Sequence, residues 1–317
     1  MQEPEHDKVV SQLRHPDASQ RQLALMQLDD IASAESVPPL IEALEDSDPV
    51  VRRLAVGVLE ELGDARAVPG IILCLLDADR EVREAASAAL RDFRGEDAAT
   101  EMIAAIAHPH PEVRRAVIVG LREQKDPRAV SPLIQALRDP SGDVRREAVI
   151  TLAYLRLPES VAPLRRCLRD ADENVRRVVV GALSYFNGPA LLPDFEAALG
   201  DSDWRVRVEA AIVLGRSALS GAIPSLQVAL RDPYWQVQKE AINSLGRLAA
   251  AAAVPELIGF LNSDAADLRR AAAYALGEIK TTRAVAALTG LARDPDVEVR
   301  KAAARALEAI NQGSAQS

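Results

Sequence analysis

The side chains that could do chemistry are few in this chain, and most of them stand at turns. Only four histidines occur among the 317 residues, all before residue 111. His108 and His110, separated by one proline, form the one group dense enough to suggest a metal site. His108 stands at a position where equivalent segments carry a loop aspartate, and the prolines beside it mark a turn. We therefore predict no metal ion and no cofactor.

The chain also lacks the common catalytic and nucleotide-binding motifs. It contains no Gly-rich phosphate loop, Gly-x-Ser-x-Gly elbow, Cys-x-x-Cys pair or His-Glu-x-x-His segment. Its two cysteines, Cys74 and Cys167, lie three sequence periods apart, at a position whose other members are mostly alanine. Helix layers stack about 8–10 Å apart, and a disulfide needs Cα atoms within about 7 Å. We expect two small buried thiols that do not pair with each other.

A 31-residue period organises the chain. Each copy has an anchor residue, in most copies an arginine after a valine, and a leucine seven residues later. The anchors are Arg21, Arg52, Arg83, Arg114, Arg145, Arg176, Arg207, Gln238, Arg269 and Arg300. Ten copies without insertion or deletion predict one supersecondary unit stacked on itself, because a single unit cannot bury its own apolar face.

Two helices fit into each period. The first has proline in its first turn, as at Pro38 and Pro224, and the second carries the anchor. Counted from the anchor, positions −1, +3, +7 and +10 are apolar and predict the buried face. Positions −2, +2, +5 and +9 are chemically mixed and predict a solvated face. An aspartate six residues before most anchors predicts an Arg–Asp ladder between neighbouring layers.

The period has a recognisable signature, Asp-Pro-x-x-x-Val-Arg-x-x-Ala-x-x-x-Leu-Gly. Residues 139–152 follow it up to the leucine, and residues 268–277 follow its second half. In this the chain resembles HEAT-like repeats of the phycobilisome lyase type over residues 7–312. The resemblance implies an all-α, right-handed α-solenoid of about ten repeats, whose second helices line a concave wall. We expect a single solenoid domain over residues 1–312, with a degraded first repeat as a cap, and a disordered tail over residues 313–317.

One enzymatic branch of these repeat proteins can be tested on the sequence. Deoxyhypusine hydroxylases of this type place His-Glu pairs directly after the anchor to hold two irons. Histidine stands at neither of the two positions after any of the ten anchors. The iron ligands of that branch are therefore missing, and we predict that the protein is not an enzyme of this kind.

The charge distribution argues against nucleic acid and membrane as partners. The net charge is −9, and phosphate contacts need a basic surface. A basic stripe follows the anchors: Arg53, Arg115, Arg146, Arg177, Lys239, Arg270 and Lys301. Acids stand three residues before four of its members, at ion-pair spacing on a helix, so the stripe is largely neutralised. The chain has no apolar run near the ~20 residues of a membrane span and no signal-peptide pattern, so we expect a cytoplasmic protein.

The aromatic residues indicate where a partner protein binds. Tyr154 and Tyr185 stand at position +9, which is charged in most other repeats and so must be exposed. Trp204 and Trp235 open two second helices, where they either fill the gap between layers or contact a partner. Tyr, Trp and Arg are the residues enriched at interface hot spots. The predicted partner-binding residues are Arg146, Ile150, Tyr154, Arg177, Tyr185, Trp204, Ile212, Arg216, Tyr234, Trp235, Arg247 and Tyr274.

These residues predict a groove for a protein or peptide on the concave face of repeats five to nine. The function that we predict is a non-catalytic interaction scaffold, an adaptor or assembly factor. The alternative, implied by the resemblance, is a subunit of a phycobilin lyase-type complex that attaches or removes a bilin on a phycobiliprotein. No nucleophile or acid–base pair in the sequence supports the alternative.

Overall fold

The regular elements of the structure, a computed structural model that describes residues 3–186 and 188–314, are all helical. The first helices of the repeats are α1 (Glu3–Gln12), α3 (Val37–Ala43), α5 (Val68–Cys74), α7 (Glu96–Ala105), α9 (Val130–Ala136), α11 (Val161–Arg166), α13 (Leu192–Ala198), α15 (Ile223–Ala229), α17 (Val254–Phe260) and α19 (Val285–Gly290). The second helices are α2 (Ala18–Ile31), α4 (Pro49–Leu62), α6 (Arg80–Ala89), α8 (Pro111–Gln124), α10 (Gly142–Leu155), α12 (Glu173–Leu183), α14 (Trp204–Arg216), α16 (Trp235–Arg247), α18 (Ala266–Ile279) and α20 (Val297–Ser314).

Short 3-10 turns precede or extend many of these helices. They are η1 (Ala65–Ala67), η2 (Pro127–Ala129), η3 (Pro158–Ser160), η4 (Cys167–Arg169), η5 (Ser184–Phe186), η6 (Pro189–Leu191), η7 (Ser220–Ala222), η8 (Ala251–Ala253), η9 (Thr282–Ala284) and η10 (Leu291–Arg293). The last helix reaches Ser314 and so includes the first two residues of the expected tail, 313–317. Residues 315–317 of that tail lie outside the described residues.

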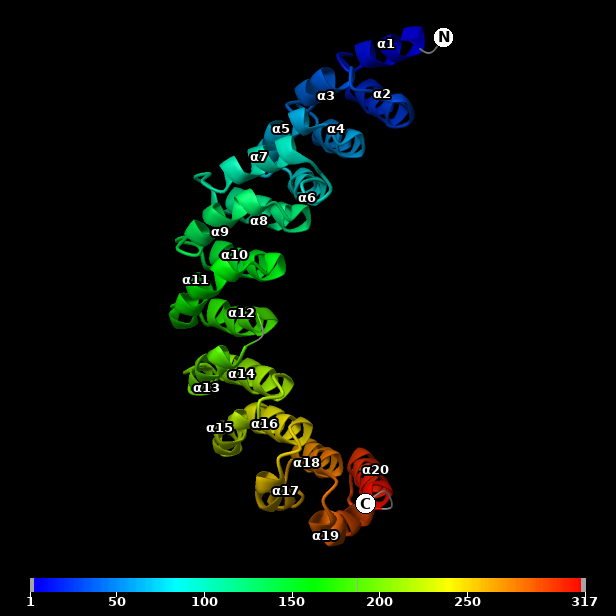
Figure 1. Cartoon of the computed structure of the whole chain (residues 1–317). Coiled ribbons are helices and arrows are strands. Elements are labelled where there is room, and N and C mark those ends of the chain that lie inside the picture. Colours follow the sequence, from blue (N-terminus) through cyan, green and yellow to red (C-terminus); the bar gives the residue numbers. More distant parts are fainter. Residues whose placement is uncertain (1–2, 187, 315–317) are drawn as a thin grey trace. The chain divides into compact units, whose positions relative to one another are not determined.

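The chain forms an α-solenoid whose repeats divide into two units of five. The first unit is Met1–Ser160 and holds α1 to α10, and the second is Val161–Ser317 and holds α11 to α20. Within the first unit α2 packs on α4, α4 on α6 and α8 on α10, and within the second unit α12, α14, α16, α18 and α20 pack in succession. In each unit the even-numbered helices form one side and the odd-numbered helices the other (Figure 1).

The helices begin where the sequence predicts. Asp48 precedes α4, and its carboxylate accepts hydrogen bonds from the backbone N–H groups of Val50 (2.9 Å) and Val51 (3.1 Å). Pro49 takes the first helical position, where its missing N–H leaves no bond unmade. Gly63 ends the helix in the left-handed conformation, with a φ of 62°, which glycine adopts without steric cost.

The buried face of the second helices differs from the one that the sequence pattern predicts. Position +10 was expected to be buried, but in most repeats it is half-buried or exposed, as at Ile31. Val51, Ala55 and Leu59, at −1, +3 and +7, are fully buried as expected. Positions +4 and +6 are also buried in most repeats, and so is +2 in several, which corrects the prediction that +2 faces solvent. Glu147, at +2 of the fifth repeat, is the clearest case. The reason is that a second helix contacts its own first helix and the second helices of both neighbouring repeats.

Small residues allow the second helices of the second unit to approach closely. A Cβ atom added to Gly246 would lie 2.7 Å from the Cα atom of Ala275 in the next repeat, and one added to Gly277 would lie 2.9 Å from that of Ala306. Such distances are shorter than van der Waals contact, so only glycine fits at these two positions. Ser244 adds a hydrogen bond from its hydroxyl to the carbonyl of Ala211 in the preceding repeat (2.7 Å).

The predicted Arg–Asp ladder is present and has one repeated geometry. Arg52 donates to Asp77 of the next repeat through both Nε (2.6 Å) and a terminal nitrogen (2.7 Å). Its other terminal nitrogen donates to the carbonyl of Asp46 in its own loop (2.6 Å). The two-pronged arrangement recurs between neighbouring repeats, for example at Arg21–Asp46, Arg52–Asp77, Arg114–Asp139, Arg176–Asp201, Arg207–Asp232 and Arg269–Asp294. Each arginine therefore joins two loops.

The ladder changes where the sequence departs from the period. Arg83 donates to the carbonyls of Asp77 (2.7 Å) and Ala78 (2.8 Å) in its own loop, and the residue at the acceptor position of the next repeat is His108. His108 still makes the turn contact that the aspartate makes in other repeats, because its Nδ1 atom accepts a hydrogen bond from the backbone N–H of His110 (3.2 Å). Gln238 likewise keeps the bond to its own loop, at the carbonyl of Asp232 (2.8 Å).

Replacing Asp77 by asparagine should lower the free energy of unfolding in urea by about 2 kcal/mol, because Arg52 then keeps a largely buried charge against a weaker acceptor. The hydrogen bonds from Arg52 hold the pKa of Asp77 below its ordinary value, against the opposing effect of burial. The difference between the two proteins should therefore be complete above the ordinary pKa and disappear as the pH falls through the lowered one. The control Arg83→Gln should cost less than about 1 kcal/mol. Equal losses would contradict the ladder's role.

Two glycine-to-alanine substitutions separate helix propensity from packing. Gly57 lies inside α4, and a Cβ atom there would meet no atom within 4 Å. Gly57→Ala should therefore stabilise the protein by about 0.5–1 kcal/mol, the ordinary gain for a helical glycine. Gly246→Ala should lower the melting temperature instead, since its Cβ atom overlaps Ala275. Stabilisation by both substitutions would show that α16 and α18 can move apart without cost.

Candidate partner-binding surface

Position +9 of the second helices is open to solvent, as predicted. Tyr154 is 42% exposed and Tyr185 is 56% exposed, so neither ring is sealed beneath other helices. Tyr154 lies in the last turn of α10, and Tyr185 lies in η5, directly after α12. Tyr154 belongs to the first unit and Tyr185 to the second. The predicted contact residues are thus divided between α10 in the first unit and four successive repeats in the second.

On α10, contacts within the unit hold the predicted residues in place. Arg146 pairs with Asp143 (2.8 Å) and lies 3.4 Å from the buried Glu147. Tyr154 donates a long hydrogen bond to Glu123 (3.5 Å), and the Nζ atom of Lys125 lies 5.3 Å from the centre of its ring. Ile150 is half-buried between them along the helix. Arg146 is therefore largely neutralised, and the aromatic ring is the main group that α10 offers to a partner.

In the second unit, Tyr185 and Arg216 stand at the rim of a hollow. The hollow has a volume of about 580 Å³ and lies between repeats six and seven. Leu191, Phe195 and Val213 contribute apolar side chains to its wall. Both rim residues are exposed. An apolar pocket with an arginine and a tyrosine at its edge is suited to an apolar side chain that stands next to an acidic group.

A half-buried carboxyl, that of Glu209, lies close to this rim. Burial raises the pKa of Glu209 above its ordinary value, and the charges of Arg177 and Arg216 oppose the rise. Gly181 leaves the space that the carboxyl occupies, because a Cβ atom there would lie 3.2 Å from a Glu209 oxygen. Arg177 is exposed on the same face, and Arg247 is exposed at the end of α16. The rim therefore carries more positive than negative charge.

Trp204, Tyr234 and Trp235 form a second group, at the start of the second helices. The rings of Trp204 and Tyr234 stack with their centres 5.9 Å apart and their planes 11° from parallel. The ring of Tyr234 also covers the guanidinium of Arg207, a ladder arginine, whose Cζ atom lies 5.4 Å from the ring centre. Lys239 lies 5.7 Å from the ring centre of Trp235. Trp204 thus joins two repeats by packing, whereas Trp235 keeps an exposed face.

The two groups lie at opposite ends of the helices. Trp204 is the first residue of α14 and Arg216 is the last, which places them about 18 Å apart along the axis at 1.5 Å per residue. Tyr274 lies midway along α18, exposed, and its hydroxyl accepts a hydrogen bond from Arg305 (3.2 Å). Ile212 is half-buried in α14. Eight of the twelve predicted residues are exposed, whereas Arg146, Ile150, Trp204 and Ile212 are half-buried, and the sequence period did not separate the two groups.

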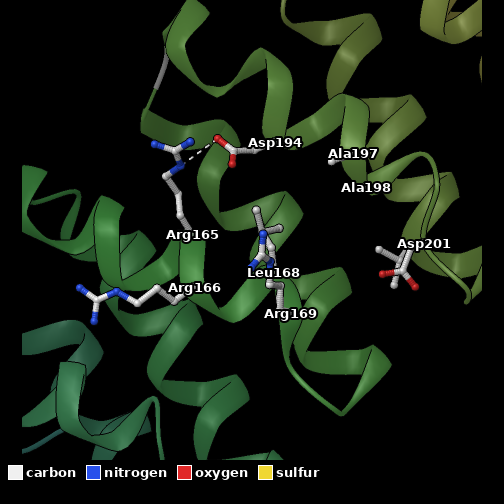
Figure 2. A pocket seen from close by; sticks show the side chains of 9 residues that line it. Arg165, Arg166, Leu168, Arg169, Asp194, Ala197, Ala198 and Asp201 are labelled. Atoms are coloured by element: carbon white, nitrogen blue, oxygen red, sulfur yellow. Dashed lines mark ion pairs between the residues drawn. The ribbon is translucent and has the colours of Figure 1, made fainter.

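A further hollow of about 540 Å³ lies on the side of the first helices in the second unit. Arg165, Arg166 and Arg169 line it together with Asp194 and Asp201 (Figure 2). Arg165 pairs with Asp194 (2.9 Å), while the side chain of Arg166 extends away from Asp194. Asp201 is already paired with the ladder arginine Arg176 (2.8 Å). The two carboxylates in the wall make the hollow a poor site for an anion.

Other chemistry finds little support in the described part of the chain. No three His, Cys, Asp or Glu side chains of residues 3–186 and 188–314 come together as metal ligands would. Burial raises the pKa of the Cys74 thiol to about 11, so it stays protonated and unreactive at neutral pH. Within the same residues, no helix is both long and apolar enough to cross a bilayer.

The succession of short helix pairs, the ladder between their loops and the open face of the second helices define an α-helical repeat protein. The family model of HEAT repeats matches residues 7–91, 68–141, 99–184, 130–215, 168–233, 192–276 and 223–308. The chain therefore belongs to the HEAT repeat family. No curated protein sequence matches the chain significantly.

Solved structures share this fold at low sequence identity. An Escherichia coli protein, YibA, is 21% identical with a TM-score of 0.53, over 93% of this chain and 99% of its own. Kap95p, solved with RanGDP, gives a TM-score of 0.68 at 16% identity, and Kap121p gives 0.64 at 15% identity. The match to Kap95p includes 98% of this chain and 50% of Kap95p. The match to Kap121p includes 96% of this chain and 41% of Kap121p. These likenesses establish the α-solenoid fold.

Alanine substitutions distinguish packing from surface residues in the second unit. Trp204→Ala should lower the free energy of unfolding by about 2 kcal/mol, because the indole fills the space between repeats seven and eight. Tyr185→Ala should change it by about 0.5 kcal/mol or less, since more than half of that side chain is exposed. Urea unfolding of both variants measures the difference. A large loss for Tyr185→Ala would show that the ring has a packing role.

Proposed function

We propose that this protein is a non-catalytic scaffold that binds a segment of a partner protein on the second-helix face of repeats five to nine. The observation that carries the proposal is the apolar hollow with Tyr185 and Arg216 at its rim. An apolar side chain of the partner fills the hollow, and a nearby acidic residue pairs with Arg216, Arg177 or Arg247.

Three further observations support this proposal. The exposed side chains of this face include the tyrosine, tryptophan and arginine that dominate interface energies. Arg177 and Arg216 lie near the half-buried carboxyl of Glu209 and outnumber it, so positive charge at the rim is available to a partner. Kap95p, which has the same kind of fold, binds a protein, RanGDP. We place this scaffold in the cytoplasm, in keeping with its two buried cysteine side chains.

We also propose that the two units belong to one continuous, right-handed repeat domain over residues 1–312. Support comes from the family matches over residues 99–184 and 130–215, which run across residue 160 without a break. The finer resemblance, to the phycobilisome lyase type, rests on the Asp-Pro-x-x-x-Val-Arg signature. It provides the alternative function, a subunit of a bilin lyase complex.

The binding proposal is tested by affinity capture from native lysate with the wild-type chain and the double variant Tyr185→Ala, Arg216→Ala. We expect the double variant to retain at most about one tenth of the captured partner, while its melting temperature stays within a few degrees of the wild type. The matched control is Val228→Ala, which removes an exposed apolar side chain from a first helix. Equal capture by the double variant and the control would contradict the proposed surface.

A separate assay tests the lyase alternative. Incubation of the protein with bilin and apo-phycobiliprotein, followed by absorbance, reports covalent attachment directly. The scaffold proposal expects no absorbance change attributable to this chain. Bilin attachment or removal that depends on this chain would replace the scaffold proposal with the lyase function.

A further inference from the structure

The first two repeats expose apolar side chains on their second-helix face. Leu23 is 46% exposed and Met26 is 57% exposed, both on α2. On the adjacent α4, Leu54 is half-buried, and Gly57 faces open space, since an added Cβ atom would meet nothing within 4 Å. We call these four residues the N-terminal apolar face. Met26 and Gly57 share position +5, the open side of the helices, so a further repeat stacked before α2 would not cover this position. Leu23 stands at +2, which faces the preceding repeat where one is present, as Glu147 faces Arg122, so Met26 is the main apolar group of this face.

Acidic side chains border this face. Residues 1–100 contain 21 acidic residues (Asp and Glu) and 10 basic residues (Lys and Arg), a net charge of −11. Residues 101–317 contain 26 acidic and 28 basic residues, a net charge of +2. Asp30, Glu61 and Asp92 are exposed at position +9 of the first three repeats. We call these three residues the acidic ridge. The negative charge of the whole chain is thus concentrated in the repeats that expose the apolar side chains.

The acidic ridge costs stability where it stands. Asp30 lies in the last turn of α2 and Glu61 in the last turn of α4, and neither turn holds a basic residue. The C-terminal end of a helix carries partial negative charge, so a carboxylate there is unfavourable by a few tenths of a kcal/mol or more. Glu60 and Asp92 are close enough that Asp92, after burial, helps to raise the pKa of Glu60. Helix stability therefore does not explain these acids.

The cations near the acidic ridge oppose it only weakly. Arg91 is exposed, and its charge offsets only in part the rise in the pKa of Glu60. Arg94 lies 4.0 Å from Asp92 through two largely exposed side chains, which is a weak contact. Arg53, the basic residue of α4 on this face, already pairs with Glu81 (3.4 Å). The charge that complements the ridge must come from a partner. A nucleic acid or an anionic membrane would be repelled.

We propose that the N-terminal apolar face and the acidic ridge together bind a basic, amphipathic segment of another protein, at a site distinct from the surface of repeats five to nine. Successive second helices stand about 8–10 Å apart, so the acids of the ridge repeat at that distance. An extended chain advances about 3.3 Å per residue. Lysine or arginine at every third residue matches the ridge, and an apolar side chain between them reaches Leu23 and Met26.

The test uses a fluorescein-labelled synthetic peptide with lysine at every third position and leucine between, and a control peptide with glutamate in place of lysine. Fluorescence anisotropy should show binding of the lysine peptide and none of the glutamate peptide. Binding should weaken strongly when the salt rises from about 50 mM to about 300 mM. Absence of binding by the lysine peptide at the lower salt concentration would overturn the proposal.

Two charge-reversal variants locate the site. The first triple variant, Asp30→Lys, Glu61→Lys, Asp92→Lys, reverses the charge of the acidic ridge. We expect it to weaken peptide binding at least about tenfold. Its melting temperature should not fall, because lysine is favourable at a helix C-terminus. Glu35→Lys, Glu45→Lys, Glu101→Lys makes the same change in net charge at exposed acids outside the ridge. Equal weakening by both triple variants would show attraction by net charge alone and overturn the site.

A variant of the apolar face completes the test. Met26→Ser should weaken peptide binding several-fold and leave the charge unchanged. Sedimentation of the wild type and Met26→Ser shows whether a second copy covers this face: a wild-type dimer that Met26→Ser dissociates would overturn the proposal. These variants leave Tyr185 and Arg216 intact, so failure here is distinguishable from failure of the proposed scaffold surface.

Discussion

The two-pronged contact between an anchor arginine and the loop aspartate of the next repeat is the interaction on which the rest of this structure depends. It fixes the spacing of neighbouring loops, because the guanidinium also holds its own loop carbonyl, as Arg52 does between Asp46 and Asp77. The aspartate in turn accepts the backbone N–H two residues later, as Asp77 does from Asp79 (2.8 Å). One side chain pair therefore sets both the turn within a repeat and the step between repeats.

With the step fixed, a second helix inside a unit buries three of its sides and exposes a narrow strip. The first helix of the repeat covers one side, and the second helices before and after it cover the other two. Where the step is shortest, glycine is required, as at Gly246 against Ala275. The exposed strip contains positions +1, +5 and +9, and the residues there can change without affecting the stack. In this strip the first three repeats carry acids and apolar side chains, and later repeats carry aromatic and basic ones.

The candidate site shows where sequence reasoning was sufficient and where it was not. Tyr154 and Tyr185 were correctly expected to be exposed, because the charged residues at position +9 of other repeats report the environment of that position. Glu147 was wrongly placed in the solvated strip, since its burial arises from a neighbouring helix that the pattern of one helix does not represent. The hollow behind Tyr185 and Arg216 is formed by side chains from three helical segments and had no signature in the period. Leu23 and Met26 stand at +2 and +5, which the sequence pattern assigned to the solvated face, yet they were not among the predicted contact residues.

The sequence alone determined the repeat, its two helices and the ladder, because a strict 31-residue spacing forces the same residue types into the same environment in each layer. It also determined that position +9 is solvent-exposed, because most repeats carry a charged residue there. The tertiary structure decided how many sides of each second helix are covered, which arginines are already paired and where neighbouring repeats leave a hollow. These properties depend on distances between helices, and such distances are set by side chains from different repeats that no single period contains.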